Sequence, residues 1–376
     1  RRFPLIRLDA AMTVARRHFR RLWHPQPGEA GAIPSRAARA LTRAEFDERM
    51  PREFWRELVD ALAVEAPGTM LLAEAFWLME VYFVRSLGMN RVYNSAFMHM
   101  TMNEQNEEYR AYLKRFLREA PQVLARFVNY MSNPDEEPAA EQFGDGDKAF
   151  GVATLMATLP GLPMFGHGQV EGLREKYGME YARPLMDEAA RPWHVERHRR
   201  EVAPLLFERP LFAGSELFRL FDVEDDEGAV LEDVYAFVNG VDRKRVLVIF
   251  NNSPHAVAGR LRRSAETLLP DGSTVSEALH EALGVHPSPG DTVALTAADG
   301  EETLLPAAEL AAHGLWVALA PYESRVFMAV RVEGTGVITS EALPSRRERR
   351  RSVPGVAVLT GDRGAAARRR NARRRR

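Results

Sequence analysis

Short apolar runs alternate with amphipathic stretches over the first two hundred residues. Three runs, at 3–8, 69–73 and 127–131, have the length of a strand that is buried in a sheet. Shorter runs at 91–97 and 162–166 indicate two further strands. Helical periodicity or capping residues mark the stretches between them, at 10–23, 42–50, 53–65, 77–87, 104–119, 148–159 and 192–208. Because strands and helices alternate, the sequence predicts a parallel sheet covered by helices.

The pattern changes after residue 222, where apolar runs follow one another with few helices between them. Asn239-Gly240 separates two of these runs and is typical of a two-residue hairpin turn. We therefore expect a second domain, an antiparallel β-sandwich, whose boundary falls in an acidic stretch. Its expected strands lie at 234–239, 245–251, 315–320 and 324–332, with a short helix at 304–313. The predicted divisions of the chain are 1–222, 223–335 and a tail over 336–376.

Composition limits the chemistry and the location of the protein. The 376-residue chain contains no cysteine, which excludes disulfides, thiolate catalysis and cysteine-ligated metals. No apolar stretch approaches the roughly 18 residues that a membrane-spanning helix needs. The first residues carry charge within their apolar part and lack the small-residue cleavage site of a signal peptide. We expect a cytoplasmic protein with no membrane partner.

The tail differs from the rest of the chain in its charge. Residues 345–376 contain 13 arginines and two acidic residues, a net charge of +11. Since the whole chain has a net charge of −1, residues 1–344 carry −12. Such a tail could bind nucleic acid through counterion release, but it has no aromatic residue on which a base would stack. We expect it to be disordered, and we do not expect a nucleic-acid partner.

Three of the predicted strands are each followed by an acidic residue, namely Asp9, Glu74 and Asp135. The carboxyl ends of parallel strands meet at one edge of a sheet, so these carboxylates are expected at the same edge. Paired carboxylates on either side of a glycosidic bond are what a glycosidase needs. Ordinary structural roles also fit: an ion pair for Asp9, a helix N-terminus for Glu74 and a turn for Asp135.

The segments around these acids resemble the α-amylase superfamily of glycoside hydrolases, family 13. Arg7-Leu8-Asp9-Ala10-Ala11 resembles the nucleophile segment, and Leu72-Ala73-Glu74-Ala75-Phe76-Trp77 resembles the acid/base strand. Asn133-Pro134-Asp135 is similar to the segment of the third catalytic aspartate, and residues 159–166 are similar to the last barrel strand. A lone R-x-D is a weak signal, whereas four such segments in order are specific together. The resemblance covers roughly residues 3–330.

The resemblance implies a fold and a reaction. The fold is a partial TIM (β/α)8 barrel, from about strand 4 to strand 8, followed by an antiparallel β-sandwich. The reaction is retaining cleavage of α-glucosidic bonds in an α-glucan or maltooligosaccharide. In this reading Asp9 is the nucleophile, Glu74 the general acid/base, and Asp135 the residue that stabilises the distorted sugar. Apolar neighbours are expected to raise the pKa of Glu74, as a general acid requires near neutral pH.

Arg7, Trp77 and His167 are the expected substrate-binding residues. Arg7 points to the same strand face as Asp9 and would orient it. Trp77 could stack on a sugar ring, and His167 lies in a loop after the last strand, although core packing and a surface position are the ordinary alternatives. His194 and His198 lack the H-E-x-x-H pattern of a zinc site, so we expect them on a solvated helix face. No metal ligand is assigned; calcium is left open.

Two departures from the family pattern leave alternatives open. Pro134 stands where the family usually has a histidine that binds the sugar. The chain also starts at what resembles the fourth barrel strand, so we expect it to be the C-terminal portion of a longer product. The alternatives are an α-glucan transglycosylase, in which a second sugar replaces water, and a catalytically inactive fragment with a carbohydrate-binding or structural role.

Overall fold

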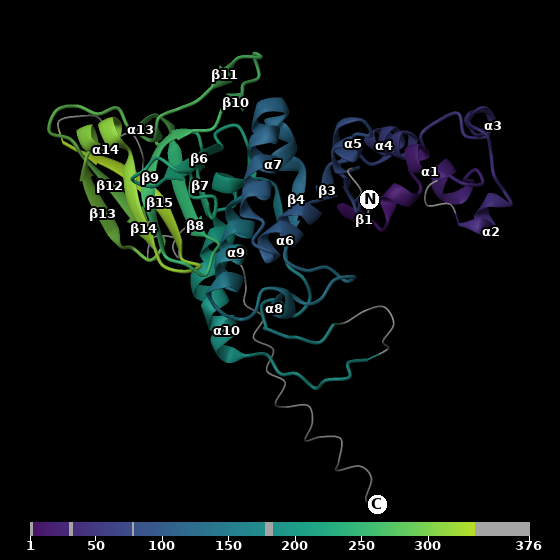
Figure 1. The fold of residues 1–376 in the computed structure, drawn as a ribbon, viewed down its shortest axis with the longest axis horizontal. Coiled ribbons are helices and arrows are strands. Elements are labelled where there is room, and N and C mark those ends of the chain that lie inside the picture. Colours follow the sequence, from purple (N-terminus) through teal and green to yellow (C-terminus); the bar gives the residue numbers. More distant parts are fainter. Residues whose placement is uncertain (1–2, 30–32, 77–78, 177–182, 335–376) are drawn as a thin grey trace, which may run out of the picture. The chain divides into compact units, whose positions relative to one another are not determined.

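The computed structural model describes residues 3–29, 33–76, 79–176 and 183–334 (Figure 1). The predicted parallel sheet is present in these residues. Its strands pair in chain order, all parallel: β1 (Leu5–Leu8), β2 (Met70–Ala73), β3 (Arg91–Tyr93), β4 (Phe127–Tyr130) and β5 (Leu162–Met164). The basic tail and Trp77 lie outside the described residues, so the predictions made for them stay predictions.

Helices and short helical turns connect these strands. They are η1 (Ala11–Thr13), α1 (Arg16–Trp23), α2 (Pro34–Ala37), α3 (Arg43–Arg49), α4 (Phe54–Glu65), α5 (Glu80–Arg85), α6 (Ser95–Met102), α7 (Asn106–Glu119), η2 (Pro121–Arg126), α8 (Ala139–Gln142), α9 (Asp147–Thr158), α10 (Pro192–Arg197), the π-helical turn η3 (His198–Val202), α11 (Ala203–Phe207) and α12 (Pro210–Ala213). The capping box predicted at the start of the α3 segment is confirmed: Thr42 and Glu45 exchange side-chain-to-backbone bonds.

The third strand is shorter than predicted. β3 ends at Tyr93, and Asn94 is the N-cap of α6: its side chain accepts a hydrogen bond from the backbone N–H of Phe97. Asn94 also donates to the side chain of Asn129 on β4 at 2.8 Å. The prediction of a strand over 91–97 was therefore wrong beyond 93, because a buried asparagine caps a helix where the apolar run alone favoured a strand.

The predicted antiparallel domain is an eight-stranded sheet. Its strand order is β13-β12-β15-β8-β7-β6-β9-β14. The strands are β6 (Arg219–Glu224), β7 (Val234–Val241), β8 (Lys244–Asn251), β9 (Val257–Ser264), β12 (Thr292–Ala297), β13 (Glu302–Pro306), β14 (Leu315–Leu319) and β15 (Ser324–Glu333). A two-stranded ribbon, β10 (Thr267–Leu268) with β11 (Thr274–Val275), and two helices, α13 (Leu279–Ala282) and α14 (Ala307–His313), complete it. β6 thus begins at Arg219, four residues before the expected start of this domain at residue 223.

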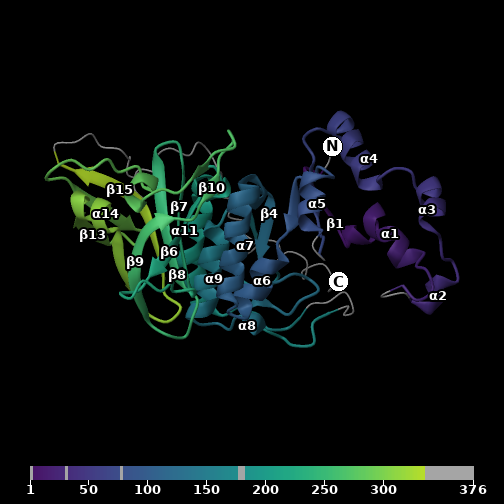
Figure 2. The same ribbon diagram turned by 45° about the horizontal axis from the view of Figure 1, so that its top comes forward.

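This sheet curls around one apolar core, in the manner of a sandwich (Figure 2). Alternate residues of β7, Val234, Ala236 and Val238, enter that core together with side chains from both ends of the sheet. The residues between them face the opposite way. Among these, Tyr235 lies 6.0 Å from Tyr109 of α7, measured between ring centroids, and Phe237 packs on Phe218. β7 is consequently buried on both faces, which explains its continuous apolar sequence.

The predicted Asn239-Gly240 turn was wrong, because both residues belong to β7. The hairpin turns at residues 242–243, where Asp242 has a positive φ of 53°. Asn239 is instead fully buried, and its side-chain amide donates to the carbonyls of Phe212 and Gly214 at 3.0 Å each. A tertiary contact with α12 therefore accounts for this asparagine, and the aspartate supplies the left-handed turn residue.

Buried polar bonds join α7 to the antiparallel sheet. Asn106 donates to the Asp233 side chain at 2.7 Å and accepts from the Tyr235 hydroxyl at 3.0 Å. One turn further along α7, the fully buried Arg110 pairs with Asp222 and, at 2.6 Å, with Glu232. Its remaining bond goes to the carbonyl of Leu231. Because the cation is buried while its partners are partly exposed, Arg110 holds the acidic 222–232 segment against α7.

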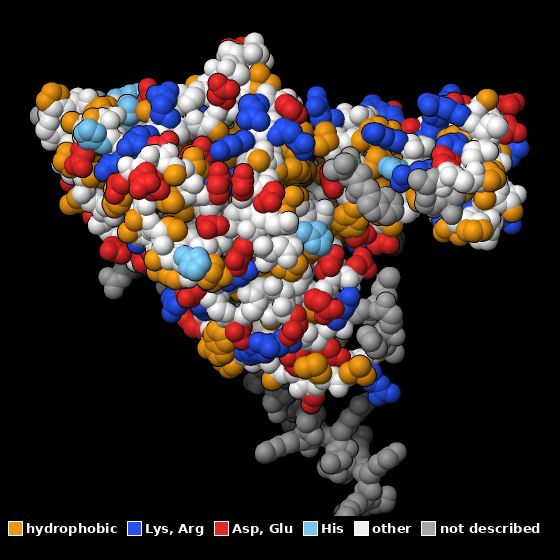
Figure 3. Space-filling model, in the orientation of Figure 1, with side chains coloured by type: hydrophobic (Ala, Val, Ile, Leu, Met, Phe, Trp, Pro, Cys, Tyr) orange, Lys and Arg blue, Asp and Glu red, His pale blue; other side chains and the backbone are white. Residues whose placement is uncertain are grey.

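Charged side chains of both signs are interspersed over the face seen in Figure 3. Within the described part of the chain, no helix is both long and apolar enough to span a bilayer.

We expect Arg110→Met to lower the free energy of unfolding by about 2 kcal/mol, since it removes the hydrogen bonds of a buried cation to Asp222 and Glu232. Arg118→Met, on the exposed side of the same helix, should change it by less than about 0.5 kcal/mol. Urea denaturation at pH 7 measures both. Equal midpoints for the two variants would show that the Arg110 pairs add nothing to stability.

Candidate active site

The register of β1 and β2 places Asp9 beside Glu74. Leu8 pairs with Ala73, and backbone bonds continue past both strand ends: Glu74 N–H donates to the Leu8 carbonyl, and Ala11 N–H donates to the Glu74 carbonyl. The residues that follow the paired positions are the two acids. Parallel pairing therefore delivers both carboxylates to the carboxyl edge of the sheet, as the sequence predicts.

Arg7 lies between the two acids and contacts both. Its Nη1 donates to Asp9 Oδ1 at 2.8 Å, and its Nη2 lies 2.8 Å from Glu74 Oε1. Its Nε donates to the Tyr93 hydroxyl at 2.8 Å. Each of the three guanidinium nitrogens thus faces a different side chain, and one cation is shared by two carboxylates.

The two carboxylates differ in environment. The Glu74 side chain is 3% exposed, whereas that of Asp9 is 66% exposed. Burial is the main cause that raises the pKa of Glu74, and the neighbouring Asp9 carboxyl acts in the same direction. The Ala10 N–H, which donates to Glu74 Oε2 at 3.0 Å, and the charge of Arg7 oppose this rise. The expected direction of the pKa of Glu74 is confirmed.

A backbone constraint supports the contact between Ala10 and Glu74. Ala10 has φ 43° and ψ 39°, the left-handed region that a residue with a Cβ rarely occupies. This conformation turns the chain directly after Asp9 and aims the Ala10 N–H at the Glu74 carboxylate. Strain of this kind persists only where surrounding contacts stabilise it, and it is frequent at functional sites.

Asp135 lies in a turn that follows β4. The side chain of Asn133 accepts from the N–H groups of Asp135 and Glu136, at 2.9 and 3.0 Å, which is the turn chemistry of asparagine before proline. Asp135 is exposed, and its carbonyl accepts from Lys176 Nζ at 2.7 Å. Its neighbour Glu136, rather than Asp135 itself, lines the cavity beside the site.

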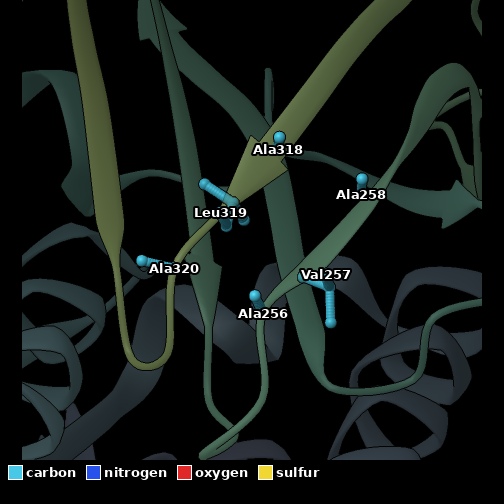
Figure 4. Close-up of a pocket in the computed structure, with 6 residues that line it drawn as sticks. All are labelled: Ala256, Val257, Ala258, Ala318, Leu319 and Ala320. Atoms are coloured by element: carbon cyan, nitrogen blue, oxygen red, sulfur yellow. The ribbon is translucent and has the colours of Figure 1, made fainter.

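This cavity opens at the carboxyl edge of the sheet. It has a volume of about 290 Å³, and it is lined by Arg7 and Tyr93 and by residues of the loops after β4 and β5. Its lining residues are Arg7, Tyr93, Ser132, Asn133, Pro134, Glu136, Pro138, Met164, Phe165, Gly166, His167, Glu175 and Lys176. The structure therefore brings the predicted Arg7 and His167 to one cavity. A second, shallow depression between β9 and β14, of about 400 Å³, has no titratable side chain among its lining residues and offers no acid–base chemistry (Figure 4).

The chain after β5 passes close to the chain after β4 at Gly166, which lines the cavity. A Cβ on Gly166 would lie 2.0 Å from the Ser132 hydroxyl oxygen, so the chain after β5 crosses the chain after β4 at backbone distance. The next turn, at Gly168, has φ 75°. Glycine at 166 thus lets Met164, Phe165 and His167 form one side of the cavity.

His194 and His198 are buried, so the expected solvated helix face was wrong. They are 3% and 6% exposed, and their rings pack against each other and against Phe150 with centroids 4.9–5.0 Å apart. His194 Nδ1 is 3.1 Å from the Val170 carbonyl. His198 lies 6.3 Å from the ring of Phe165, which lines the cavity. Through these contacts with Phe165 and Val170, the two histidines pack against the loop after β5.

The described residues contain no group of three or more His, Asp or Glu side chains arranged to hold a metal ion.

Among the residues that line the cavity, sequence reasoning did not single out Tyr93, Glu175 and Lys176. Tyr93 gave no strand-end signal, because the predicted strand ran to residue 97; in the structure Ala73 pairs with Val92, so Tyr93 lies level with Glu74. Glu175 gave none: its carboxylate accepts from the N–H groups of Leu185 and Met186, a contact that a linear pattern does not reveal.

Comparison with known proteins shows similarity of fold. No family model matches the chain, and no curated protein sequence matches it. Among solved structures, a Nostoc punctiforme debranching enzyme soaked with acarbose is 14% identical with a TM-score of 0.51 over 73% of this chain. An α-amylase from Geobacillus thermoleovorans in complex with acarbose is 13% identical with a TM-score of 0.50 over 75% of this chain.

The chain spans a little over half of those structures, 54% of the first and 57% of the second. At such low identity the likeness shows the fold alone. The predicted fold is confirmed at that level: the described residues form a parallel sheet of five strands followed by an antiparallel sheet, an arrangement similar to that of these solved structures.

The pH dependence of stability tests the role of His198. Burial lowers the pKa of His198 from 6.5 to about 4, with His194 acting in the same direction and Glu201 opposing it. Because the folded state favours the neutral ring, the stabilisation is complete above pH 6.5 and is lost as the pH falls towards 4.

We therefore expect His198→Gln to flatten the decline of the unfolding free energy between pH 6.5 and pH 4, measured by urea denaturation at several pH values. The exposed His313 provides the control, and His313→Gln should leave the slope unchanged. Identical slopes for wild type and His198→Gln would contradict the assignment.

Proposed function

We propose that the protein is a retaining glycosidase that cleaves α-glucosidic bonds in an α-glucan or maltooligosaccharide. The observation that supports this most directly is the shared guanidinium: Arg7 contacts the exposed Asp9 and the buried Glu74 from one position. Two carboxylates held on the same cation are close enough to act on one sugar ring. The fold of the α-glucan-processing enzymes to which the structure is similar agrees with this chemistry.

The different environments of the two acids suit two different tasks. The exposed Asp9, paired with the Arg7 guanidinium, attacks the anomeric carbon. The buried Glu74, whose pKa is raised, holds a proton for the leaving oxygen. After the leaving group departs, Glu74 takes a proton from water, which displaces Asp9 and restores the anomeric configuration.

The cavity and the loops around it would hold the sugar. His167, Lys176 and Glu136, which line the cavity, offer donors and acceptors for hydroxyl groups. Asp135 remains the proposed third carboxylate because its segment resembles the one that carries this residue in the family. Its neighbour Glu136, and not Asp135, lines the cavity. Water as acceptor gives hydrolysis, whereas a second sugar at the same position gives transglycosylation, so product analysis at high oligosaccharide concentration separates these outcomes.

Incubation with maltohexaose tests the proposal. We expect new reducing ends, with the α-anomer formed first in proton NMR spectra, because two displacements retain configuration. Asp9→Asn should lower kcat by about 10⁴-fold or more, since it removes the nucleophile while leaving the fold in place. The exposed Asp60→Asn on α4 is the control and should retain full activity. A folded wild-type chain that releases no reducing sugar would favour the inactive-fragment alternative.

Asp135→Asn and Glu136→Gln distinguish the two adjacent acids. If Asp135 stabilises the distorted sugar, its substitution lowers kcat by at least about a hundredfold, the scale of a transition-state contact to a charged group. Glu136→Gln should then chiefly raise KM, because a cavity-lining acceptor binds ground state and transition state alike. Steady-state kinetics on maltohexaose gives both values. The reverse pattern would assign the role of the third carboxylate to Glu136.

A further inference from the structure

The contacts of Arg7 are unequal in their ability to hold it in place. Its partner Asp9 is 66% exposed, and exposed ion pairs contribute little because solvent and side-chain motion weaken them. Glu74 Oε1 is near Arg7 Nη2, but no donor is aligned on that oxygen for a hydrogen bond. The remaining contact, from Arg7 Nε to the Tyr93 hydroxyl, is a well-formed bond of 2.8 Å.

Tyr93 is itself immobilised by its surroundings. It is 1% exposed, and its ring lies 4.9 Å from Tyr130 and 6.4 Å from Phe76 between centroids. Its backbone belongs to the parallel sheet, where it pairs with Val128 of β4. The Tyr93 hydroxyl therefore has a fixed position on the cavity wall. A phenylalanine at position 93 would fill the same space but would lack this hydroxyl.

A guanidinium is planar and rigid, so a fixed Nε also fixes the direction of both Nη atoms. The guanidinium carbon of Arg7 lies 5.5 Å from the centroid of the Tyr93 ring, which adds a second contact from the same side chain. Without the hydroxyl, a 31% exposed arginine regains several rotamers and leaves its Nε–H without a partner.

We propose that Tyr93 is a positioning residue for the acid–base pair: its hydroxyl holds Arg7 so that one guanidinium faces Asp9 and Glu74 together. Tyr93 acts through Arg7 and touches neither carboxylate in this role. The inference deepens the proposed function, and only its kinetic test rests on that function.

The sign of the effect follows from the charges. Arg7 lowers the pKa of Glu74, against the larger effect of burial. A guanidinium that is free to move away weakens this opposition, so the pKa of Glu74 rises further. In an enzyme that needs Glu74 protonated, the alkaline limb of the kcat–pH profile then moves to higher pH.

The first test uses Tyr93→Phe, which keeps the ring and removes one oxygen. We expect kcat on maltohexaose to fall about ten- to a hundredfold, the factor for one lost hydrogen bond to a charged group, with KM unchanged. The alkaline limb should shift upward. Tyr82→Phe, whose hydroxyl bonds Glu53 at 3.4 Å on another helix, is the matched control and should leave kcat and both limbs unchanged.

The second test does not need activity. Carbon-13 NMR of the Glu74 side-chain carboxyl, assigned with Glu74→Gln, follows its titration in the intact chain. The midpoint should lie higher in Tyr93→Phe than in wild type. If wild type cleaves no glucan, the proposed function fails while this titration still decides the role of Tyr93.

Arg7→Lys separates positioning from general packing, because lysine keeps the charge and lacks the planar fork. If Tyr93 acts through Arg7, adding Tyr93→Phe to Arg7→Lys changes the Glu74 midpoint no further. Additive shifts, or a folded Tyr93→Phe whose Glu74 midpoint and kcat match those of wild type, would overturn the proposal.

Discussion

One cation shared by two carboxylates is the interaction on which the site depends. Asp9 and Glu74 lie side by side because β1 and β2 are parallel and in register, and two acids so placed repel each other. Arg7 offsets this repulsion from within the same strand, since it shares a face with Asp9. The geometry thus needs three conditions together: parallel pairing, this register and an arginine two residues before the first acid.

Burial makes the two acids unequal. Glu74 is covered by β1, by the left-handed turn at Ala10 and by the Arg7 side chain, whereas Asp9 lies at the rim. Under the proposed function the two acids have different tasks, and these tasks require different solvation. A small difference in how deeply the two side chains are buried is sufficient to produce two different environments, because desolvation strongly penalises the charged form of a carboxyl group.

The antiparallel sheet stabilises the part of the molecule that carries the loops of the site. β7 and β8 are buried on both faces, against their own core and against α7, α9 and α12. α9 leads directly into β5 and the Gly166 crossing, and a Cβ on its Gly151 would collide with the Phe250 ring of β8. The loop after β5 therefore rests on helices that the second sheet holds in place, and the His194–His198 stack supports it further.

Much of the strand and helix pattern could be predicted because apolar runs of strand length and capping residues are local signals. The predictions failed where a tertiary contact competes with a local one. Asn239 is satisfied by carbonyls of α12 and not by a turn, Asn94 caps a helix inside an apolar run, and His194 and His198 find ring partners from α9. A polar side chain in a linear pattern does not show whether its hydrogen bonds go to solvent or to a distant backbone.

The sequence by itself determined the chemistry at hand: three acids at strand ends, an arginine in phase with one of them, and the alternation that makes the strands parallel. Only the tertiary structure decided which acid is buried, that one guanidinium contacts two carboxylates, and that its Nε donates to the Tyr93 hydroxyl. These depend on register and on the depth of each side chain, and both are set by packing between segments that lie 64 to 86 residues apart.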